Sequence, residues 1–145
     1  LYGGNLVEVL AEAPVRCGSA DADRPCTTAL MRQQARHHPR HVTNLRHLCV
    51  PVDGFSRQVI ELLDGQRDRA AVTAALVQRR RDGVFQVPDT GGQVVETDAQ
   101  WTDFFGSRLP PILDLLAQRH FLTETDPARF AVAPVSGGNI LPSAG

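Results

Sequence analysis

The chain contains no lysine: all 15 of its fixed cations are arginines, against 16 acidic residues and a formal net charge of −1. The absence of lysine excludes a Schiff-base nucleophile, an amine general base and a P-loop lysine. Net positive charge is also lacking, which argues against nucleic acid as a partner, and no apolar run reaches the roughly 18–20 residues of a membrane span. The three cysteines show no CxxC spacing, which argues against a disulfide framework and favours a reducing, cytoplasmic compartment.

The chain is long enough and hydrophobic enough to form one folded domain, with 145 residues of which 42% are hydrophobic. It begins at Leu1 rather than methionine and carries no signal sequence, so we expect a piece of a longer protein. We divide it into an N-terminal strand and linker over 1–25, at the end of a preceding domain, a folded domain over 26–133, and a flexible tail over 134–145 that is rich in Gly, Pro and Ser.

Apolar residues at helical spacing predict three short helices in the first half of the domain. The middle one has an apolar stripe that runs from Phe55 to Leu62. Before it, residues 41–52 are rich in β-branched groups and are predicted to be extended, with Pro51 favouring an edge position. Each of the three helices has a predicted cap at its start and a predicted breaker at its end. From the first helix to the third, these pairs are Thr27 or Thr28 with Pro39, Asp53 with Gly65, and Asp68 with Gly83.

After these helices, residues 84–96 are predicted to form a β-hairpin. Valine and phenylalanine flank the pair Gly91-Gly92, which permits the positive φ of a tight turn. Two helices followed by a hairpin, with extended segments on either side, are typical of one architecture. The predicted fold class is therefore α+β, a small winged-helix-like domain with short helices, a β-hairpin wing and flanking strands.

The last part of the domain is predicted to be helical again. Thr97 begins a helix with a capping-box pattern, and Pro110 and Pro111 are expected to break or kink it. A final helix up to Leu122 and a short strand at 130–133 follow.

No residue pattern predicts catalysis or a resident cofactor in this chain. Four histidines and Cys49 lie close together at 37–49, but their spacing fits no compact metal motif, because two are adjacent and Pro39 interrupts the helix. The serines lack a GxSxG context and the glycine pairs are not GxGxxG. A solvated basic loop, or a surface that contacts another domain, is the favoured interpretation of the histidines.

The sequence nevertheless shows an ordered set of motifs, VTNLRH at 42–47 and LLDGQRDRAAVTAAL at 62–76, preceded by NLVEVLAEA at 5–13 and RPCTTALMRQQAR at 24–36. The set resembles the C-terminal region of bacterial SAM-dependent methyltransferases that carry a methyltransferase regulatory domain, a class that includes protein-lysine methyltransferases. The match departs from the family pattern at Gln66, where a threonine is usual. The resemblance covers roughly residues 1–85.

The resemblance implies a non-catalytic accessory or regulatory domain that positions protein substrate or contacts the catalytic methyltransferase domain. S-adenosylmethionine is implied for the parent enzyme alone, because this chain has no Gly-rich strand–turn–helix unit to bind it. Packing and capping explain most of the motif residues, and Asp68 in particular is a helix cap. The candidate interaction residues are Asn44, Arg46, His47, Arg67 and Arg69.

Two other functions remain open on the sequence alone. Arg79, Arg80 and Arg81 end a possible recognition helix, which would suit a DNA-binding winged helix, although the helix dipole also favours cations there. A peptide-binding module that adds a strand to an exposed edge is the second alternative.

Overall fold

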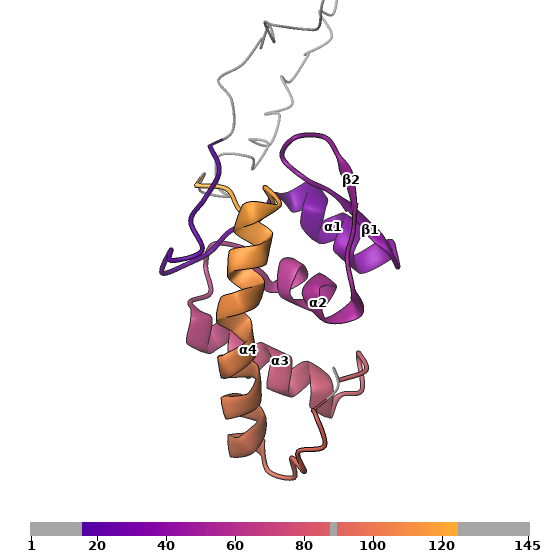
Figure 1. The fold of residues 1–145 in the computed structure, drawn as a ribbon, viewed down its shortest axis with the longest axis vertical. Coiled ribbons are helices and arrows are strands. Elements are labelled where there is room, and N and C mark those ends of the chain that lie inside the picture. The colour runs from indigo at the N-terminus through magenta and orange to yellow at the C-terminus, as the bar shows by residue number, and fades with distance from the viewer. Residues whose placement is uncertain (1–15, 88–89, 125–145) are drawn as a thin grey trace, which may run out of the picture.

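The structure is a computed structural model that describes residues 16–87 and 90–124 (Figure 1). The predicted strands at 1–13 and 130–133 and the tail at 134–145 lie outside these residues. One long helix, α4, runs the length of the molecule, with α3 against its lower half and the other elements beside its upper half (Figure 1). The elements are α1 (Ala29–His37), β1 (His41–Thr43), β2 (Cys49–Pro51), α2 (Gly54–Leu62), α3 (Arg69–Arg81) and α4 (Asp98–Gln118). The predicted α+β class is confirmed.

Side-chain caps begin all four helices at predicted positions. The Asp53 carboxylate accepts from the backbone N–H groups of Phe55 and Ser56, both at 2.9 Å, and Thr97 and Gln100 form the predicted capping box. Thr28, rather than Thr27, caps α1, and Asp68 caps α3. These caps satisfy backbone donors that a helix N-terminus otherwise leaves unpaired.

The glycines predicted to end two helices both have positive φ. Gly83, at φ +69°, follows the last residue of α3 and its cap, as expected for a left-handed C′ position. Gly65, at φ +75°, lies two residues beyond the C-cap Leu63 of α2. It therefore belongs to the turn between α2 and α3, where the Asp64 carboxylate accepts from the backbone N–H groups of Gln66 and Arg67.

The only paired strands among the described residues belong to a short antiparallel hairpin within the predicted extended segment. Val42 pairs with Val50 at its centre, and the Val42 side chain is buried. The placement of the predicted wing at 84–96 is wrong, since its described residues form no strand. Gly91 and Gly92 do make a turn with positive φ, but Phe85 and its neighbours pack on the core instead of pairing with each other.

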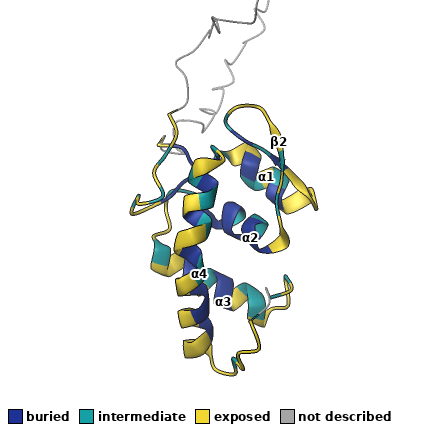
Figure 2. Cartoon of the chain, in the orientation of Figure 1, coloured by how far each residue is buried: buried dark blue, intermediate teal, exposed yellow. Residues whose placement is uncertain are grey.

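The predicted break at Pro110 and Pro111 is also wrong, because α4 continues through both. The two prolines are exposed, and the carbonyl groups that they leave without an N–H partner belong to Gly106 and Ser107, which are exposed as well. Water can hydrogen-bond to these carbonyl groups, and Gly106 has no side chain to crowd the ring of Pro110. Burial of the opposite face of α4 outweighs the local loss (Figure 2).

The core lies along the inner face of α4 (Figure 2). At its lower end five aromatic rings cluster with centroids 5.5–6.1 Å apart, from Phe55, Phe85, Trp101, Phe104 and Phe105. Aliphatic side chains from α1, α2 and the hairpin continue the core upwards. Among the described residues, no helix is long and apolar enough to cross a membrane.

The two ends of the described chain meet beside the C-terminal end of α4. The Gly18 N–H donates to the Leu122 carbonyl at 2.8 Å, and the Glu124 N–H donates to the Arg16 carbonyl at 3.1 Å. Gly18 is required by space, because a Cβ there would lie 2.7 Å from the Thr123 carbonyl oxygen. Leu122 is buried in this segment rather than in the predicted final helix, since α4 ends at Gln118.

Candidate interaction surface

Asn44 is buried and organises the loop at 44–48 that joins the two strands. Its side-chain oxygen accepts from the backbone N–H groups of Arg46 and Leu48, both at 3.0 Å, while its Nδ2 donates to the Arg119 carbonyl at 2.9 Å. The last bond ties the loop to the end of α4. Asn44 thus has the structural role of holding the loop in one conformation, and its side chain is not available to a partner.

Arg46 and His47, in contrast, point away from the fold. Both are exposed, and His47 has a left-handed backbone with φ +60°, which the bonds of Asn44 support. Leu48 is 58% exposed although its backbone N–H and C=O are both bonded to Asn44. A cation, an imidazole and an apolar side chain are therefore presented together on a fixed loop.

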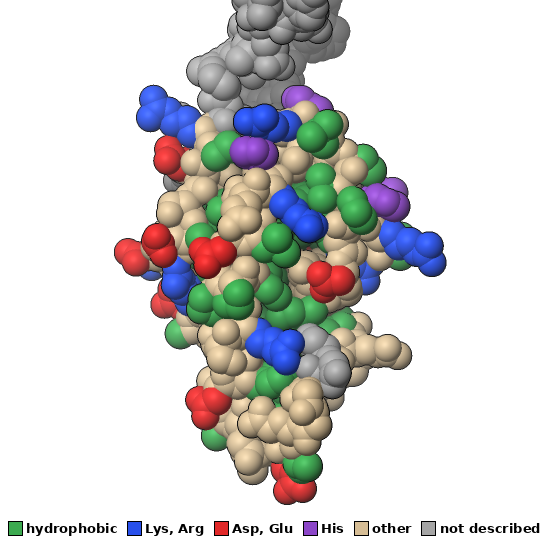
Figure 3. Space-filling model, in the orientation of Figure 1, with side chains coloured by type: hydrophobic (Ala, Val, Ile, Leu, Met, Phe, Trp, Pro, Cys, Tyr) green, Lys and Arg blue, Asp and Glu red, His purple; other side chains and the backbone are tan. Residues whose placement is uncertain are grey.

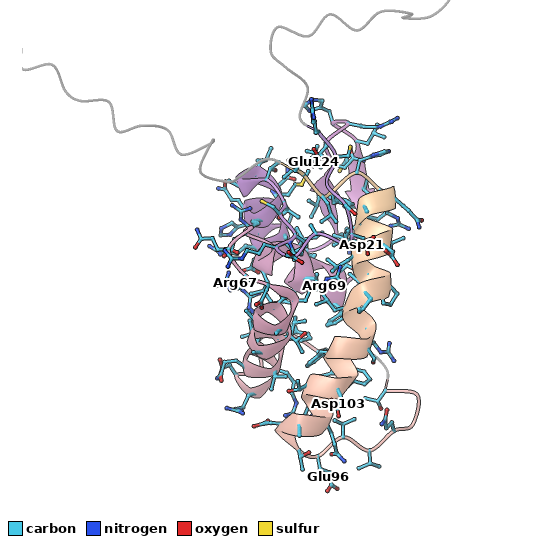
Figure 4. The ribbon with its side chains drawn as sticks, turned by 90° about the vertical axis from the view of Figure 1, so that its left-hand side faces the viewer. Asp21, Arg67, Arg69, Glu96, Asp103 and Glu124 are labelled. Atoms are coloured by element: carbon cyan, nitrogen blue, oxygen red, sulfur yellow. The ribbon has the colours of Figure 1, made fainter. Side chains whose placement is uncertain are left out.

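Arg67 and Arg69 lie elsewhere, at the turn before α3. Figure 4 shows them at mid-height, with Asp21 near Arg69 and with Glu124 at the upper end of the molecule. Arg67 pairs with Asp64 within the turn, and Arg69 donates to the Ala20 carbonyl at 2.5 Å. Of the five candidate residues, the structure brings together Asn44, Arg46 and His47 and keeps Arg67 and Arg69 apart from them.

The three arginines that end α3 all have partners within the molecule. Arg79 donates to Gln58 at 2.7 Å and to Glu61 at 3.0 Å, the Arg80 guanidinium lies 4.3 Å from the centre of the Trp101 ring, and Arg81 pairs with Asp98. A recognition helix needs such groups free to contact phosphates and bases. These contacts therefore count against the DNA-binding alternative.

Glu61 joins three helices through one carboxylate. It accepts from Arg79 of α3 and from Arg36 of α1, both at 3.0 Å. Burial acts to raise the pKa of Glu61, but the hydrogen bonds and charges of the two arginines outweigh it and the pKa lies below its ordinary value. Burial also acts to raise the pKa of Asp53, but hydrogen bonds from the Ser56 hydroxyl and from backbone N–H groups outweigh it and lower that pKa. The pKa of Asp64 is lowered against burial by hydrogen bonds from backbone N–H groups and by the charge of Arg67.

We expect the free energy of unfolding to decrease in acid. The folded pKa values of Asp53, Glu61 and Asp64 lie below the ordinary values of 3.8 for aspartate and 4.5 for glutamate, so the folded state releases its protons at lower pH. The stabilisation is complete above the ordinary values and is lost as the pH falls through the folded ones. Urea unfolding between about pH 7 and about pH 3 measures it. Glu61→Gln should flatten the curve, and an unchanged curve would contradict this account.

The histidine-rich segment forms no metal site in the described part of the chain, where no three His, Cys, Asp or Glu side chains converge. A hollow of about 290 Å³ lies between the end of α1 and the hairpin, lined by His38, Arg40, His41 and Cys49 among others. A second hollow of about 640 Å³ lies at the start of α3. It is lined by Asp21, Asp23, Arg24, Asp68, Arg69 and Ala70.

Sequence reasoning missed Arg119 and His120, which lie against the loop at the end of α4. The His120 carbonyl accepts from the Leu45 N–H at 2.9 Å, and its Nδ1 lies 3.6 Å from the Cys17 sulfur. No local pattern could have revealed this, because the partners are far apart in the sequence. His120 has φ +60°, a conformation that marks the abrupt end of the helix.

The four helices and the short antiparallel hairpin, whose loop lies against the end of α4, make up a small α+β domain. A family model described as "PKMT, C-terminal winged helix domain" matches residues 23–121, and the chain belongs to this family. No curated protein matches the chain.

Two solved structures of PKMT2 from Rickettsia typhi have a similar fold. The one in complex with AdoHcy has a TM-score of 0.63 and 19% identity, over 73% of this chain and 22% of that chain. The other also has a TM-score of 0.63, with 18% identity, over 77% of this chain and 23% of that chain. The chain thus corresponds to less than a quarter of the length of these relatives.

Proposed function

We propose that this chain is a non-catalytic accessory domain of a cytoplasmic protein-lysine methyltransferase, with residues 26–133 and the preceding segment at 16–25, which pairs with 122–124, as its folded unit. The domain would position the protein substrate or brace the catalytic methyltransferase domain, and that catalytic domain would bind S-adenosylmethionine. The observation that carries the proposal is membership of the PKMT C-terminal winged helix family. The AdoHcy in one PKMT2 structure supports the cofactor, since AdoHcy is S-adenosylmethionine after loss of its methyl group.

The candidate residues divide into two roles under this proposal. Arg46 and His47 are the contact residues, because they are exposed on a fixed loop. Asn44 positions them, and Arg67 and Arg69 hold the turn before α3 in place through bonds within the domain. The contacts of the α3 arginines leave the DNA-binding alternative without its main support.

Titration of this chain with S-adenosylmethionine in a calorimeter should give no heat of binding. Micromolar binding would contradict the accessory role, because it would place the cofactor site in this chain. In the protein made from the complete reading frame, deletion of residues 16–133 should slow methyl transfer to protein lysine while S-adenosylmethionine still binds. Undiminished transfer after the deletion would also contradict the proposal.

A further inference from the structure

The arginines of this domain fall into two groups. Most have a partner within the fold, whether a carboxylate, a carbonyl group or an aromatic ring. Within residues 16–87 and 90–124, five arginine side chains have no hydrogen bond, ion pair or ring contact: Arg16, Arg24, Arg40, Arg46 and Arg119. Every one of the five is exposed.

Three of these five free arginines come together at one end of the molecule. Arg46 is on the loop that Asn44 ties to the Arg119 carbonyl, and Arg16 lies in the segment that pairs with Glu124 just beyond α4. His47 from the loop and His120 from the end of α4 join them. We call this set the basic end: Arg16, Arg46, His47, Arg119 and His120.

The charges of the molecule are unevenly distributed along α4. Figure 3 shows the histidines on the upper part of the visible face, while acidic side chains are most frequent on its left flank and at its lower end. Figure 4 likewise places Asp103 and Glu96 at the lower end, opposite the end where Glu124 lies. Glu124 is one acidic residue at the basic end, since its backbone N–H donates to the Arg16 carbonyl.

The basic end is also organised in advance. The three bonds of the Asn44 side chain and the bond from Leu45 to His120 fix the loop against α4, so a partner need not order it. Leu48 supplies an exposed apolar side chain, 58% accessible, beside Arg46 and His47. A fixed loop with guanidinium groups and one apolar anchor is suited to a protein surface.

We propose that the basic end binds an acidic segment of a protein, with arginine–carboxylate pairs around a contact to Leu48. The inference rests on the proposed function, which requires the domain to hold another part of its enzyme or its substrate. The chain enters and leaves the described domain beside this end, at Arg16 and Glu124. A partner region of the same polypeptide would thus be present at high effective concentration, and pairs of modest strength would suffice.

Carboxylates suit the surface better than a nucleic acid does. Binding of a duplex relies on many phosphate contacts along an extended basic face, and this molecule has a net charge of −1 and an acidic lower end. The basic end is compact, and guanidinium groups pair with carboxylates in a forked geometry.

The test is a titration of this chain into a fluorescent hexaglutamate peptide at low salt, followed by anisotropy, with hexaglutamine as the neutral probe. Arg46→Gln and Arg119→Gln should each weaken binding about three- to tenfold, since each removes one close charge pair. Arg24→Gln is the matched control, because Arg24 is an equally unpaired, exposed arginine away from the basic end, and it should change affinity less than about twofold. The variants alter exposed side chains, and thermal melts check that they fold.

A second probe tests the apolar contact. A peptide with one central glutamate replaced by leucine should bind more tightly than its charge predicts, and Leu48→Ala should remove that gain. Amide shifts on titration should lie at 16–17, 44–48 and 119–124.

Equal losses from Arg24→Gln and Arg46→Gln, equal binding of hexaglutamine, or tighter binding of a short DNA duplex would each overturn the proposal. None of these outcomes bears on S-adenosylmethionine binding or on the effect of deleting the domain, so the proposed function is tested separately.

Discussion

Replacement of Phe105 by alanine should lower the free energy of unfolding by about 3–5 kcal/mol. Phe105 is fully buried, and its ring lies 5.5–5.6 Å, centre to centre, from those of Phe55, Trp101 and Phe104. Alanine leaves a cavity where α2 and α4 meet, and the helices around it cannot collapse into the space without disturbing their other contacts. Because a domain of this size is stable by only about 5–15 kcal/mol, the loss would be a large part of the total.

Urea unfolding followed by circular dichroism measures this loss, with the m-value as a check that the transition stays two-state. Leu30→Ala is the control, since Leu30 lies on α1 with 57% exposure and its truncation should change stability by less than about 0.5 kcal/mol. A loss below about 1 kcal/mol for Phe105→Ala would mean that the aromatic cluster is not the centre of the core.

Asn44→Ala should lower the free energy of unfolding by about 2–3 kcal/mol, which is large for a polar residue in a loop. The substitution removes three hydrogen bonds, two that shape the loop and one that ties it to α4. The Arg119 carbonyl and the N–H groups of Arg46 and Leu48 would lose their partner together. The loop would also lose its fixed conformation, so binding of the hexaglutamate probe should weaken although no charge is removed.

Asn44→Asp separates the two functions of the side chain. Aspartate keeps an oxygen for the two loop N–H groups but loses the Nδ2 donor and faces the Arg119 carbonyl with a negative charge. We expect it to be about as destabilising as alanine at neutral pH and to improve on acidification, when a protonated carboxyl can donate to that carbonyl. An Asn44→Ala protein with unchanged stability would refute the role given to this residue.

Local signals predicted the beginnings of the helices, because a cap acts within one turn. Asp53, Asp68 and Thr97 cap their helices as the sequence indicates, and Gly83 ends α3. Local signals failed where tertiary burial decided the outcome. The described residues of 84–96 form no strand, and Phe85 packs on the aromatic cluster instead.

Tertiary burial also decided the outcome in α4, where the proline pair predicts a break that does not occur. Pro110 and Pro111 remove hydrogen-bond donors, but only on an exposed face, whereas Leu109 and Leu113 are buried on the other. A helix pattern that continues on both sides of a proline pair, with glycine one turn earlier, is the signal that would have predicted the outcome.

For the candidate surface, the sequence identified the loop but not its surroundings. Arg46 and His47 stood out because packing did not account for them, and the structure explains this by their exposure. Arg119 and His120 could not be found, because their proximity to the loop depends on how the loop at 44–48 meets the end of α4. From the sequence alone, Asn44 is a candidate contact residue like Arg46 and His47. Its burial shows instead that its side chain stabilises the loop from within the fold.

The pairing of the first and last described segments has a consequence for how the domain forms during synthesis. The Gly18–Leu122 and Arg16–Glu124 bonds close a loop that contains nearly the whole described domain, so they cannot form until residues 122–124 have left the ribosome. Helices α1 to α3 can form earlier, but the packing against α4 must wait. If the two ends of the domain were pulled apart, the force would act directly on these same bonds. We expect them to break first, one after another, before the contacts of the aromatic core bear any of the force.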